Sequence, residues 1–370
     1  MTRVAKFLGL DVHKDSIAIA CCEGGPIAAP VHVATVPNDI PRVVKRILKL
    51  GPAEHLRVAY EAGPTGYGLC RALLEAGVHC IVVAPGKVPK EPGKRVKTDK
   101  RDARELARLL YCGYLEGITL PDRAQEALRD LVRSREDCMR DLRRSRQRLK
   151  GFLLRHGRIW TGRTSWSQKF REWVRHQAFD AEAQRVTLKH YFDEVEHLEM
   201  VRDHLTAEIE RLIPTLDQEE LFRSLQALRG VSTIVAATIV CEVGDLRRFP
   251  SAGQFMSYLG LVPSEHSSGD KRSLGAITKA GNTHVRRVMI EAGWACRLRP
   301  NRSLTLLRRQ EGLEPKIVDI AWKAQNRLNQ VYVRLRKKGR QQNVAVVALA
   351  RQLAGFIWAI GQEVQPKPAA

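Results

Sequence analysis

The sequence predicts an α/β plus α protein, with an N-terminal α/β domain, a long helical insertion and a mostly helical C-terminal domain. Three patterns support this prediction. Residues 4–112 alternate between short apolar runs and stretches with helical spacing. Residues 122–154 and 183–213 repeat apolar side chains at helical spacing over many turns, and the pattern from residue 221 onward is mostly helical. We therefore expect domains at residues 1–120, 121–215 and 216–370.

The N-terminal elements follow an order that fits a central mixed sheet covered by helices. Strands are predicted at residues 4–11, 16–22, 56–61 and 79–83, and helices at residues 40–50 and 67–76. The first two strands are joined by a short turn at His13 and Lys14 and resemble the start of a β-meander. Residues 85–101 are rich in lysine, proline and glycine, so we expect a functional loop there and a helix from about Arg101.

Two long helices in the middle of the chain are predicted to pair as an antiparallel coiled coil. The second has near-heptad apolar spacing and ends at Pro214. The first carries many arginines on its other faces, and Arg143 and Arg144 are candidates for nucleic-acid binding. The connection, residues 155–180, mixes aromatic side chains with arginine and lysine. These aromatics either stack on bases or cap the helical hairpin, and the sequence favours neither alternative.

The C-terminal part has two interruptions in its helical pattern. A glycine- and serine-rich loop occupies residues 263–281, and a basic turn with the sequence RLRKKGRQQ precedes the last apolar helix.

The composition favours a polyanionic partner. Sixty-two lysine and arginine residues against forty acidic residues give a formal charge of +22, which attracts phosphate and releases counterions on binding. Nucleic acid is the leading candidate for this partner. The alternatives are that the charge is merely solvated, or that the protein docks on an anionic membrane surface. The eight cysteines lack metal-ligand spacing, so we expect buried free thiols. Without a signal-like start or an apolar stretch near the length of a membrane span, we expect a cytoplasmic protein.

Four acidic residues stand at places that a fold can bring together. Asp11 ends the apolar run KFLGLD, Glu61 ends the run RVAYE, and Asp99 and Asp102 lie three apart where a helix begins. Metal-dependent cleavage of a phosphodiester needs several such oxygen ligands around Mg²⁺, or Mn²⁺ in its place. The alternative is that the acids at strand and helix ends are ordinary turn and capping residues.

The cations around the last two acids favour the metal site over the capping role. Lysine and arginine surround Asp99 and Asp102, which suits a phosphate beside a metal ion. The candidate phosphate-binding residues here are Lys97, Lys100 and Arg101. We expect Asp15, which lies near Asp11, to be a turn residue instead.

The phrases GLDVHKD, YEAGPTGYGL and KTDKRDARELARLL, with the four acids in this order, resemble the N-terminal domain of the DEDD transposases of insertion sequences. The C-terminal stretch from ALRGVSTIV to VMIEAG resembles the transposase domain of the same family. The resemblance implies an RNase H-like fold close to RuvC, with Asp11, Glu61, Asp99 and Asp102 binding Mg²⁺. It also implies a C-terminal domain with a serine loop and a segment like a helix-hairpin-helix.

The resemblance further implies that a serine attacks DNA and forms a phosphoserine linkage. The family pattern, G-L-x-P followed by Ser-Gly and basic residues, places this nucleophile at Ser268, although Ser264, Ser267 and Ser273 lie close by. Its expected phosphate-binding neighbours are Lys271, Arg272 and Lys279. One departure from the family is RGVST, where Ser232 replaces a glycine and puts close approach of the backbone to phosphate in doubt.

Members of this family can act with a structured noncoding guide RNA, encoded beside the gene, that pairs with donor and target DNA. The resemblance therefore implies DNA and a guide RNA as partners, and a homo-oligomer, either a dimer or a tetramer. In such a system the RNA reads the DNA sequence and the protein contacts shape and backbone. A chain that is rich in arginine and has no recognisable sequence-reading module agrees with this.

Three hypotheses follow for the function. The first is RNA-guided DNA recombination, with metal held by the four acids and Ser268 as the nucleophile. The second is a metal-dependent junction nuclease that uses water, and the third is a non-catalytic nucleic-acid-binding protein. A P-loop nucleotide hydrolase is excluded, because the sequence contains no Walker-type GxxxxGK[ST] motif.

Overall fold

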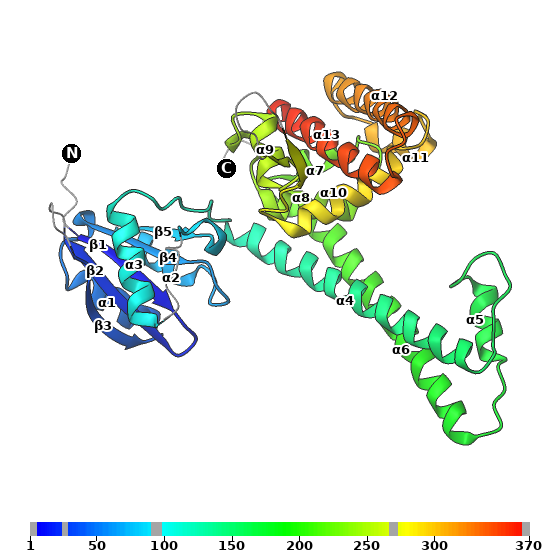
Figure 1. Ribbon diagram of the computed structural model, residues 1–370, viewed down its shortest axis with the longest axis horizontal. Coiled ribbons are helices and arrows are strands. Elements are labelled where there is room, and N and C mark those ends of the chain that lie inside the picture. The colour runs from blue at the N-terminus through cyan, green and yellow to red at the C-terminus, as the bar shows by residue number, and fades with distance from the viewer. Residues whose placement is uncertain (1–5, 24–28, 90–97, 266–272, 365–370) are drawn as a thin grey trace. The chain divides into compact units, whose positions relative to one another are not determined.

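The computed structural model describes residues 6–23, 29–89, 98–265 and 273–364 (Figure 1). The chain divides into two compact units, Met1–Leu120 and Pro121–Ala370. The first unit is built on a β-sheet and the second is almost entirely helical. This confirms the predicted succession of a mixed α/β part and a helical part.

A five-stranded mixed sheet forms the centre of the first unit, with the strand order β3-β2-β1-β4-β5. Strands β1 (Lys6–Val12), β2 (Ser16–Glu23) and β3 (Val31–Pro37) form an antiparallel meander. Strands β4 (Leu56–Glu61) and β5 (His79–Val83) run parallel to β1. The β3 strand is absent from the sequence prediction, because none of its residues is buried and its apolar pattern is therefore weak.

Helices cover both faces of this sheet. Helices α1 (Ile40–Leu48) and α2 (Gly68–Glu75) bury their apolar sides against one face, where Leu8 and Leu10 of β1 are fully buried. Helix α3 (Asp99–Tyr111) packs on the other face through Ala103 and Ala107. The helix predicted from Arg101 thus begins two residues earlier, because the Thr98 carbonyl already accepts helical hydrogen bonds from residues 101 and 102.

Gly9 sets how closely α3 approaches the sheet. A Cβ atom at this position would lie 2.1 Å from the Ala103 carbonyl oxygen and 2.4 Å from the Ala107 nitrogen. Such distances are impossible for any other residue without movement of the helix. Because Gly9 precedes Asp11 by two residues on β1, this contact fixes α3 beside the strand end that carries Asp11.

The second unit begins with a helical hairpin. Helices α4 (Arg123–Arg155) and α6 (Glu182–Leu212) lie antiparallel, with Arg135 donating to Thr206 and Ser145 donating to Glu194. The short helix α5 (Gln168–Arg175) lies between them in sequence and packs on the same apolar cluster. The pairing agrees with the predicted antiparallel arrangement.

The aromatic residues of the connection contribute to the core of this hairpin. Phe170 is fully buried, and its ring lies 5.0–5.7 Å from the rings of Trp160, Trp166 and Trp173. The indole of Trp160 also donates a hydrogen bond to the Thr164 carbonyl. Of the two alternatives left open by the sequence, the structure supports capping of the hairpin.

The rest of the second unit is a helical core with one small hairpin. Its helices are α7 (Glu219–Leu225), α8 (Thr233–Val243), α9 (Ala252–Tyr258), α10 (Thr283–Ala295), α11 (Leu304–Gln310), α12 (Pro315–Lys337) and α13 (Gln342–Glu363). Strands β6 (Pro263–Glu265) and β7 (Leu274–Ile277) pair antiparallel within the segment predicted to be only a loop. The basic turn is also shorter than predicted, since its first residues belong to α12.

Helix α13 is long and apolar enough, by length and composition alone, to cross a membrane. The expectation that no apolar stretch approaches this length is therefore wrong. The helix nevertheless packs inside the second unit, where Leu349, Leu353 and Ile357 are fully buried. Its apolar composition is explained by this central position in the core.

Candidate active site

The acidic residues predicted from the sequence lie at one end of the first unit's sheet. Asp11 is the penultimate residue of β1 and Glu61 is the last residue of β4. The two strands are parallel and in register, with Leu10 opposite Tyr60. The next pair in this register is Asp11 and Glu61, on neighbouring strands about 4.8 Å apart.

Asp11, His13 and Asp99 form a compact group at this end. The His13 Nε2 atom lies 3.2 Å from Asp11 Oδ2 and 3.5 Å from Asp99 Oδ1. One ligand atom from each of the three residues lies within 4.8 Å of the others. Two of the four predicted acids are therefore brought together, one from a strand and one from the first turn of α3.

The other two acids lie near this group but outside it. Asp102 follows Asp99 by three residues on α3, so both side chains lie on one helix face. Its charge acts on Asp11, because it raises the pKa of that carboxyl group. Glu61 is exposed at the end of β4. The structure thus places all four predicted acids at the same edge, but groups only Asp11 and Asp99 closely.

The electrostatics of Asp11 favour a bound cation. Burial raises the pKa of Asp11 most, and the charges of Asp102 and Asp99 raise it further, while His13 lowers it. The cluster therefore contains carboxylates that repel one another in a partly desolvated place. Carboxylate oxygens with one imidazole nitrogen suit a divalent ion such as Mg²⁺ or Mn²⁺, and the imidazole suits Mn²⁺ better.

His13 is a site residue that the sequence analysis missed and assigned only to a turn. The signal was present in the phrase DVH, because residues two apart on a strand point to the same side. Asp11 follows Gly9 by two residues on the face that α3 covers, and His13 follows Asp11 by two. Strand β1 ends at Val12, so His13 stands at the start of the following turn, where its ring contacts Asp11 and Asp99.

The predicted cations of the first unit flank this group. Lys100 and Arg101 follow Asp99 in the first turn of α3, and both side chains are exposed. Lys97 lies outside the described residues. The exposed pair is placed where a phosphate bound beside the acids would meet positive charge.

The predicted nucleophile belongs to the second unit. Ser268, Lys271 and Arg272 lie outside the described residues, as does Ser267. Of the neighbours considered, Ser264 stands on β6 and Ser273 directly precedes β7. Strands β6 and β7 are therefore the described elements on either side of Ser268 in the sequence.

The base of the β6–β7 hairpin is held by close backbone contacts. Lys279 is exposed and has a left-handed backbone with φ of +56°. On either side, Gly260 and Gly281 contact backbone so closely that a Cβ atom would lie 2.1 Å from the Ala280 oxygen and 2.0 Å from the Tyr258 oxygen, respectively. The chain entering α10 is consequently fixed against the turn after α9.

Buried ion pairs connect this base to α4. Glu242 of α8 accepts two hydrogen bonds from Arg133, at 2.7 and 3.0 Å, and one from the Asn282 side chain at 2.8 Å. Burial by itself raises the pKa of Glu242, but these bonds outweigh it and lower the pKa. Asn282 also caps α10, because its side-chain oxygen accepts a hydrogen bond from the Val285 nitrogen.

Glu136 of α4 forms a second network one turn away. Its carboxylate binds His284 at 2.8 Å and Arg287 at 3.0 Å, both on α10, and Arg140 at 2.8 Å on its own helix. Burial would raise the pKa of Glu136, but these partners hold it at about 2. Together the two networks fix α10, and with it the end of the hairpin segment, to the long helix.

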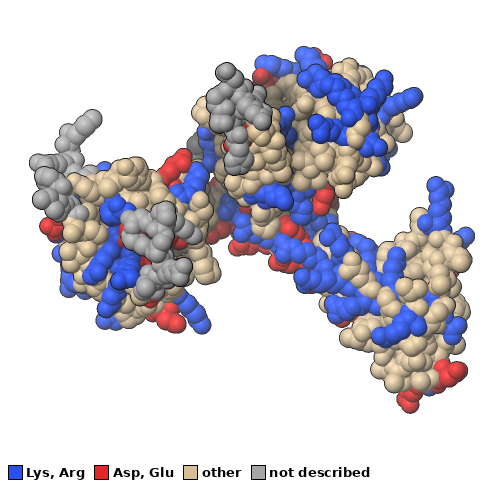
Figure 2. All heavy atoms as spheres, viewed as in Figure 1, with Lys and Arg blue, Asp and Glu red and all other residues tan. Residues whose placement is uncertain are grey.

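The candidate nucleic-acid residues on α4 differ in their partners. Arg144 forms an ion pair with Asp141 at 3.3 Å, whereas Arg143 is exposed and forms no ion pair with a residue that the structure describes. Figure 2 shows basic and acidic side chains mixed along this helix. Much of its positive charge is therefore balanced within the hairpin.

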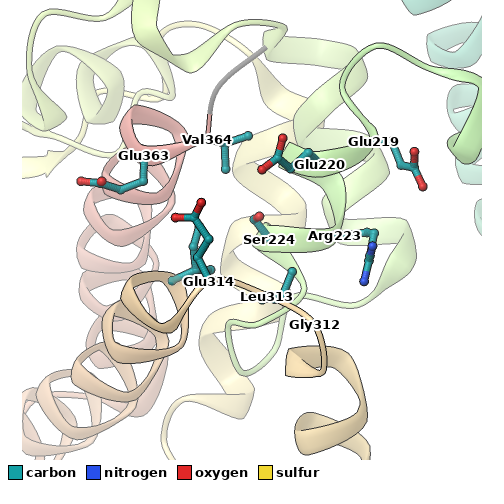
Figure 3. Close-up of a pocket in the computed structure, with 10 residues that line it drawn as sticks. Glu219, Glu220, Arg223, Ser224, Gly312, Leu313, Glu314, Glu363 and Val364 are labelled. Carbon is teal, nitrogen blue, oxygen red and sulfur yellow. The ribbon is translucent and has the colours of Figure 1, made fainter. Parts of the chain in front are cut away.

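A cavity of about 270 Å³ in the second unit lies between α7, the start of α12 and the end of α13 (Figure 3). Carboxylates from three segments border it, namely Glu219 and Glu220, Glu314, and Glu363. One guanidinium, that of Arg223, also borders it. Its acidic lining repels phosphate, so this cavity does not belong to a nucleic-acid site.

Seven of the eight cysteines are buried, all eight are free, and Cys112 is exposed. The expectation of buried free thiols is confirmed for those seven. Burial raises the pKa of several, including Cys296 to about 12, so these thiols stay protonated and take no part in nucleophilic chemistry.

Comparison with known proteins places two family models on this chain. Residues 8–157 match the DEDD transposase model of the IS110 type, and residues 223–307 match the transposase model of the IS116/IS110/IS902 family. A putative transposase y4qE of Sinorhizobium fredii is 41% identical over 97% of this chain and 89% of its own. The transposase for insertion sequence element IS1533 of Leptospira borgpetersenii is 30% identical over 90% of this chain and 98% of its own.

Proposed function

This chain belongs to the IS116/IS110/IS902 family of transposases, and from that premise we propose that it excises and inserts an insertion-sequence element through a metal-dependent acidic site and a serine nucleophile. Family membership establishes that the protein acts in DNA transposition. The metal, the serine and the guide RNA are the parts that we propose. The observation that carries the proposal is the convergence of Asp11, His13 and Asp99 at one strand end.

The acidic residues would hold a divalent ion, with Asp11 and Asp99 as its nearest ligands and Glu61 and Asp102 completing the set. When bound, the ion supplies positive charge that stabilises the charge developing on the scissile phosphate. Lys100 and Arg101 add positive charge beside it and position the DNA backbone. His13 orients Asp11 and Asp99 through its contacts with both.

Ser268 is the proposed nucleophile, on the strength of the family resemblance. Its hydroxyl oxygen forms a bond to phosphorus while the bond from phosphorus to one sugar oxygen breaks, and that sugar oxygen leaves as a hydroxyl group after taking a proton. Lys271, Arg272 and Lys279 would balance the charge of the phosphate during this exchange. A free sugar hydroxyl of a second strand then attacks the phosphoserine, which releases the serine and rejoins the DNA.

A noncoding guide RNA and a homo-oligomer complete the proposal. Support for the RNA is the family resemblance together with a strongly basic chain. Support for a dimer or tetramer is again the resemblance, since the acidic residues and Ser268 belong to different units of the chain. In such an assembly, the acids of one subunit and the serine of another act on the same phosphate.

Covalent adducts test this proposal. Purified protein is incubated with Mg²⁺, its flanking noncoding RNA, and labelled element-junction and target DNA, and protein–DNA adducts are resolved on denaturing gels. We expect adducts with the parent protein and with the matched controls Asp15→Asn and Ser267→Ala, and none with Asp11→Ala or Ser268→Ala. Cut DNA without adduct would indicate a nuclease that uses water, and DNA binding without cutting would leave only a non-catalytic role.

A further inference from the structure

The C-terminal part of the chain contains a long stretch without acidic residues. Residues 320–362 include eight lysine and arginine residues and no aspartate or glutamate, and residues 292–310 include five arginines and again no acid. Figure 2 shows basic side chains gathered over the part of the second unit that contains α12 in Figure 1. From the sequence, only part of this charge was expected, in a basic turn before the last helix.

Three cations of α12 lie on one side of the helix. Lys323, Arg327 and Arg334 are exposed, and at 100° per residue their side chains point within about 40° of one another. From the first to the third, the helix rises about 16 Å. They therefore form a straight row of positive charge along the helix.

The connection between α10 and α11 extends this row into a surface. The Asn329 side chain donates to the carbonyl oxygens of Arg297 and Leu298, both at 3.0 Å, so the connection is fixed along α12. The guanidinium of Arg302 lies 4.8 Å from the centre of the Trp322 ring on α12. The exposed side chains of Arg297, Arg299 and Arg302 thus flank the row.

The six residues Arg297, Arg299, Arg302, Lys323, Arg327 and Arg334 are named here the α12 basic surface. None of them forms an ion pair with any residue in the described part of the chain. The long hairpin differs, because its cations Arg148, Arg175 and Lys189 pair with Glu194, Glu196 and Asp193, respectively. The charge of the α12 basic surface is therefore unpaired, whereas each of these three hairpin cations has an acidic partner.

We propose that the α12 basic surface binds the phosphate backbone of double-stranded DNA. The inference rests on the proposed function for the identity of the nucleic acid, because DNA is the substrate that membership of a transposase family implies. Unpaired, exposed cations in a fixed row attract phosphates, and each phosphate that they neutralise releases counterions. Contacts to phosphate oxygens carry no direct sequence information, so a contact of this kind holds the duplex without reading its sequence.

Equilibrium binding of the full-length protein to a labelled duplex, measured with EDTA at several salt concentrations, tests this inference. The variant K323Q/R327Q/R334Q is compared with the matched control R148Q/R175Q/K189Q, which also removes three exposed positive charges. We expect the first variant to lose about tenfold or more in affinity, and its slope of log K against log salt to fall by about 2.7, at about 0.9 per phosphate contact. For the control, the slope changes by less than about 1.

Equal slope changes in the two variants would overturn the inference, because total charge would then matter and position would not. A loss of affinity for a structured RNA with unchanged affinity for duplex DNA would overturn it in favour of an RNA surface. A change in oligomeric mass with unchanged DNA affinity would identify a subunit interface instead. Should the triple variant melt early, the single variant Arg327→Gln is measured in its place, with an expected slope change of about 0.9.

This assay needs no cleavage, so it separates the inference from the proposed function. The parent protein can bind DNA through α12 and still fail to form a covalent adduct. In that case the serine mechanism is wrong, but the proposal that the α12 basic surface binds DNA is supported. Conversely, the triple variant could form adducts normally at low salt and show an unchanged slope of log K against log salt. This result would support the serine mechanism and contradict the proposed role of the α12 basic surface.

Discussion

The acidic edge of the first unit and the base of the β6–β7 hairpin in the second unit are built in different ways. At the acidic edge, strand register and the contact of α3 with Gly9 place Asp11 and Asp99. The hairpin base depends on buried ion pairs with Arg133 and Glu136, far away in the sequence on α4. The comparison teaches that packing positions the first site, whereas buried ion pairs act together with close backbone contacts at the second.

Replacing Asp11 with asparagine tests whether the acidic edge is built for function rather than stability. We expect DNA cleavage to fall by a hundredfold or more, since charge stabilisation by a bound ion contributes roughly several kcal/mol. The free energy of unfolding should stay the same or rise, because a repelled carboxylate is removed. Cleavage rates and chemical denaturation are measured together, with Asp15→Asn as the control.

A lower stability of Asp11→Asn, comparable with the loss in activity, would contradict this view of the acidic edge. It would mean that the carboxylate serves the fold, as a capping or turn residue does.

Replacing Gly9 with alanine breaks the packing that positions the acidic edge. The added Cβ atom would meet the Ala103 carbonyl oxygen at 2.1 Å, so we expect a loss of about 3 kcal/mol or more in the free energy of unfolding. Gly86→Ala is the control, because a Cβ atom there meets nothing within 4 Å. Urea denaturation of the two variants gives the difference, and equal stabilities would show that α3 is free to shift.

Replacing His13 with glutamine sharpens the description of the acidic edge. We expect the affinity for Mn²⁺ to fall by about ten- to a hundredfold, as for the loss of a residue that orients or binds at a metal site. Isothermal titration with Mn²⁺ measures this, and His55→Gln, on another part of the first unit, is the control. Unchanged Mn²⁺ affinity would assign His13 to the turn alone.

Acid titration addresses the hairpin base. The pKa of Glu136 is about 2 in the folded protein, below its ordinary value of about 4.3 in the unfolded chain. Its stabilising contribution is therefore complete above about pH 5 and is lost as the pH falls toward 2. We expect Glu136→Gln to lower stability at pH 7 by on the order of 1–3 kcal/mol and to flatten the dependence of stability on pH between 5 and 2.

Thermal melting across this pH range measures the effect, with Glu291→Gln, an exposed partner of Arg287, as the control. Parallel pH curves for the parent and Glu136→Gln would show that the network contributes no pH-dependent stability.

Much of the first unit could be predicted from the sequence, because strands and helices there follow local patterns. Strands β4 and β5 were predicted with their observed bounds, and the edge strand β3 escaped because it is hardly buried. The edge that unites the acids was also predicted from their strand and helix ends. His13 was not, because its spacing of two residues from Asp11 is only a weak local signal and its contact with Asp99 depends on the approach of α3.

In the second unit, the helices were predictable but the connections between them were not. The β6–β7 hairpin and the contacts of Gly260 and Gly281 depend on backbone meeting backbone at a distance in sequence. The balance of charge on α4 was hidden for the same reason, because several of the acids that pair with its arginines come from other helices, such as Glu242 of α8 with Arg133 and Glu199 of α6 with Arg146. The composition gives the number of charged residues, but the partners in each ion pair depend on the fold.

Asn282 performs two tasks with one amide group, and this narrows what can replace it. Its oxygen caps α10 while its nitrogen donates to Glu242. Aspartate, serine and threonine can cap a helix, but aspartate would bring a second negative charge to Glu242, and the shorter hydroxyl residues cannot offer a separate acceptor and donor at both places. Copies of this element that drift in sequence should therefore tolerate change at the exposed Thr283 next to it far sooner than at position 282.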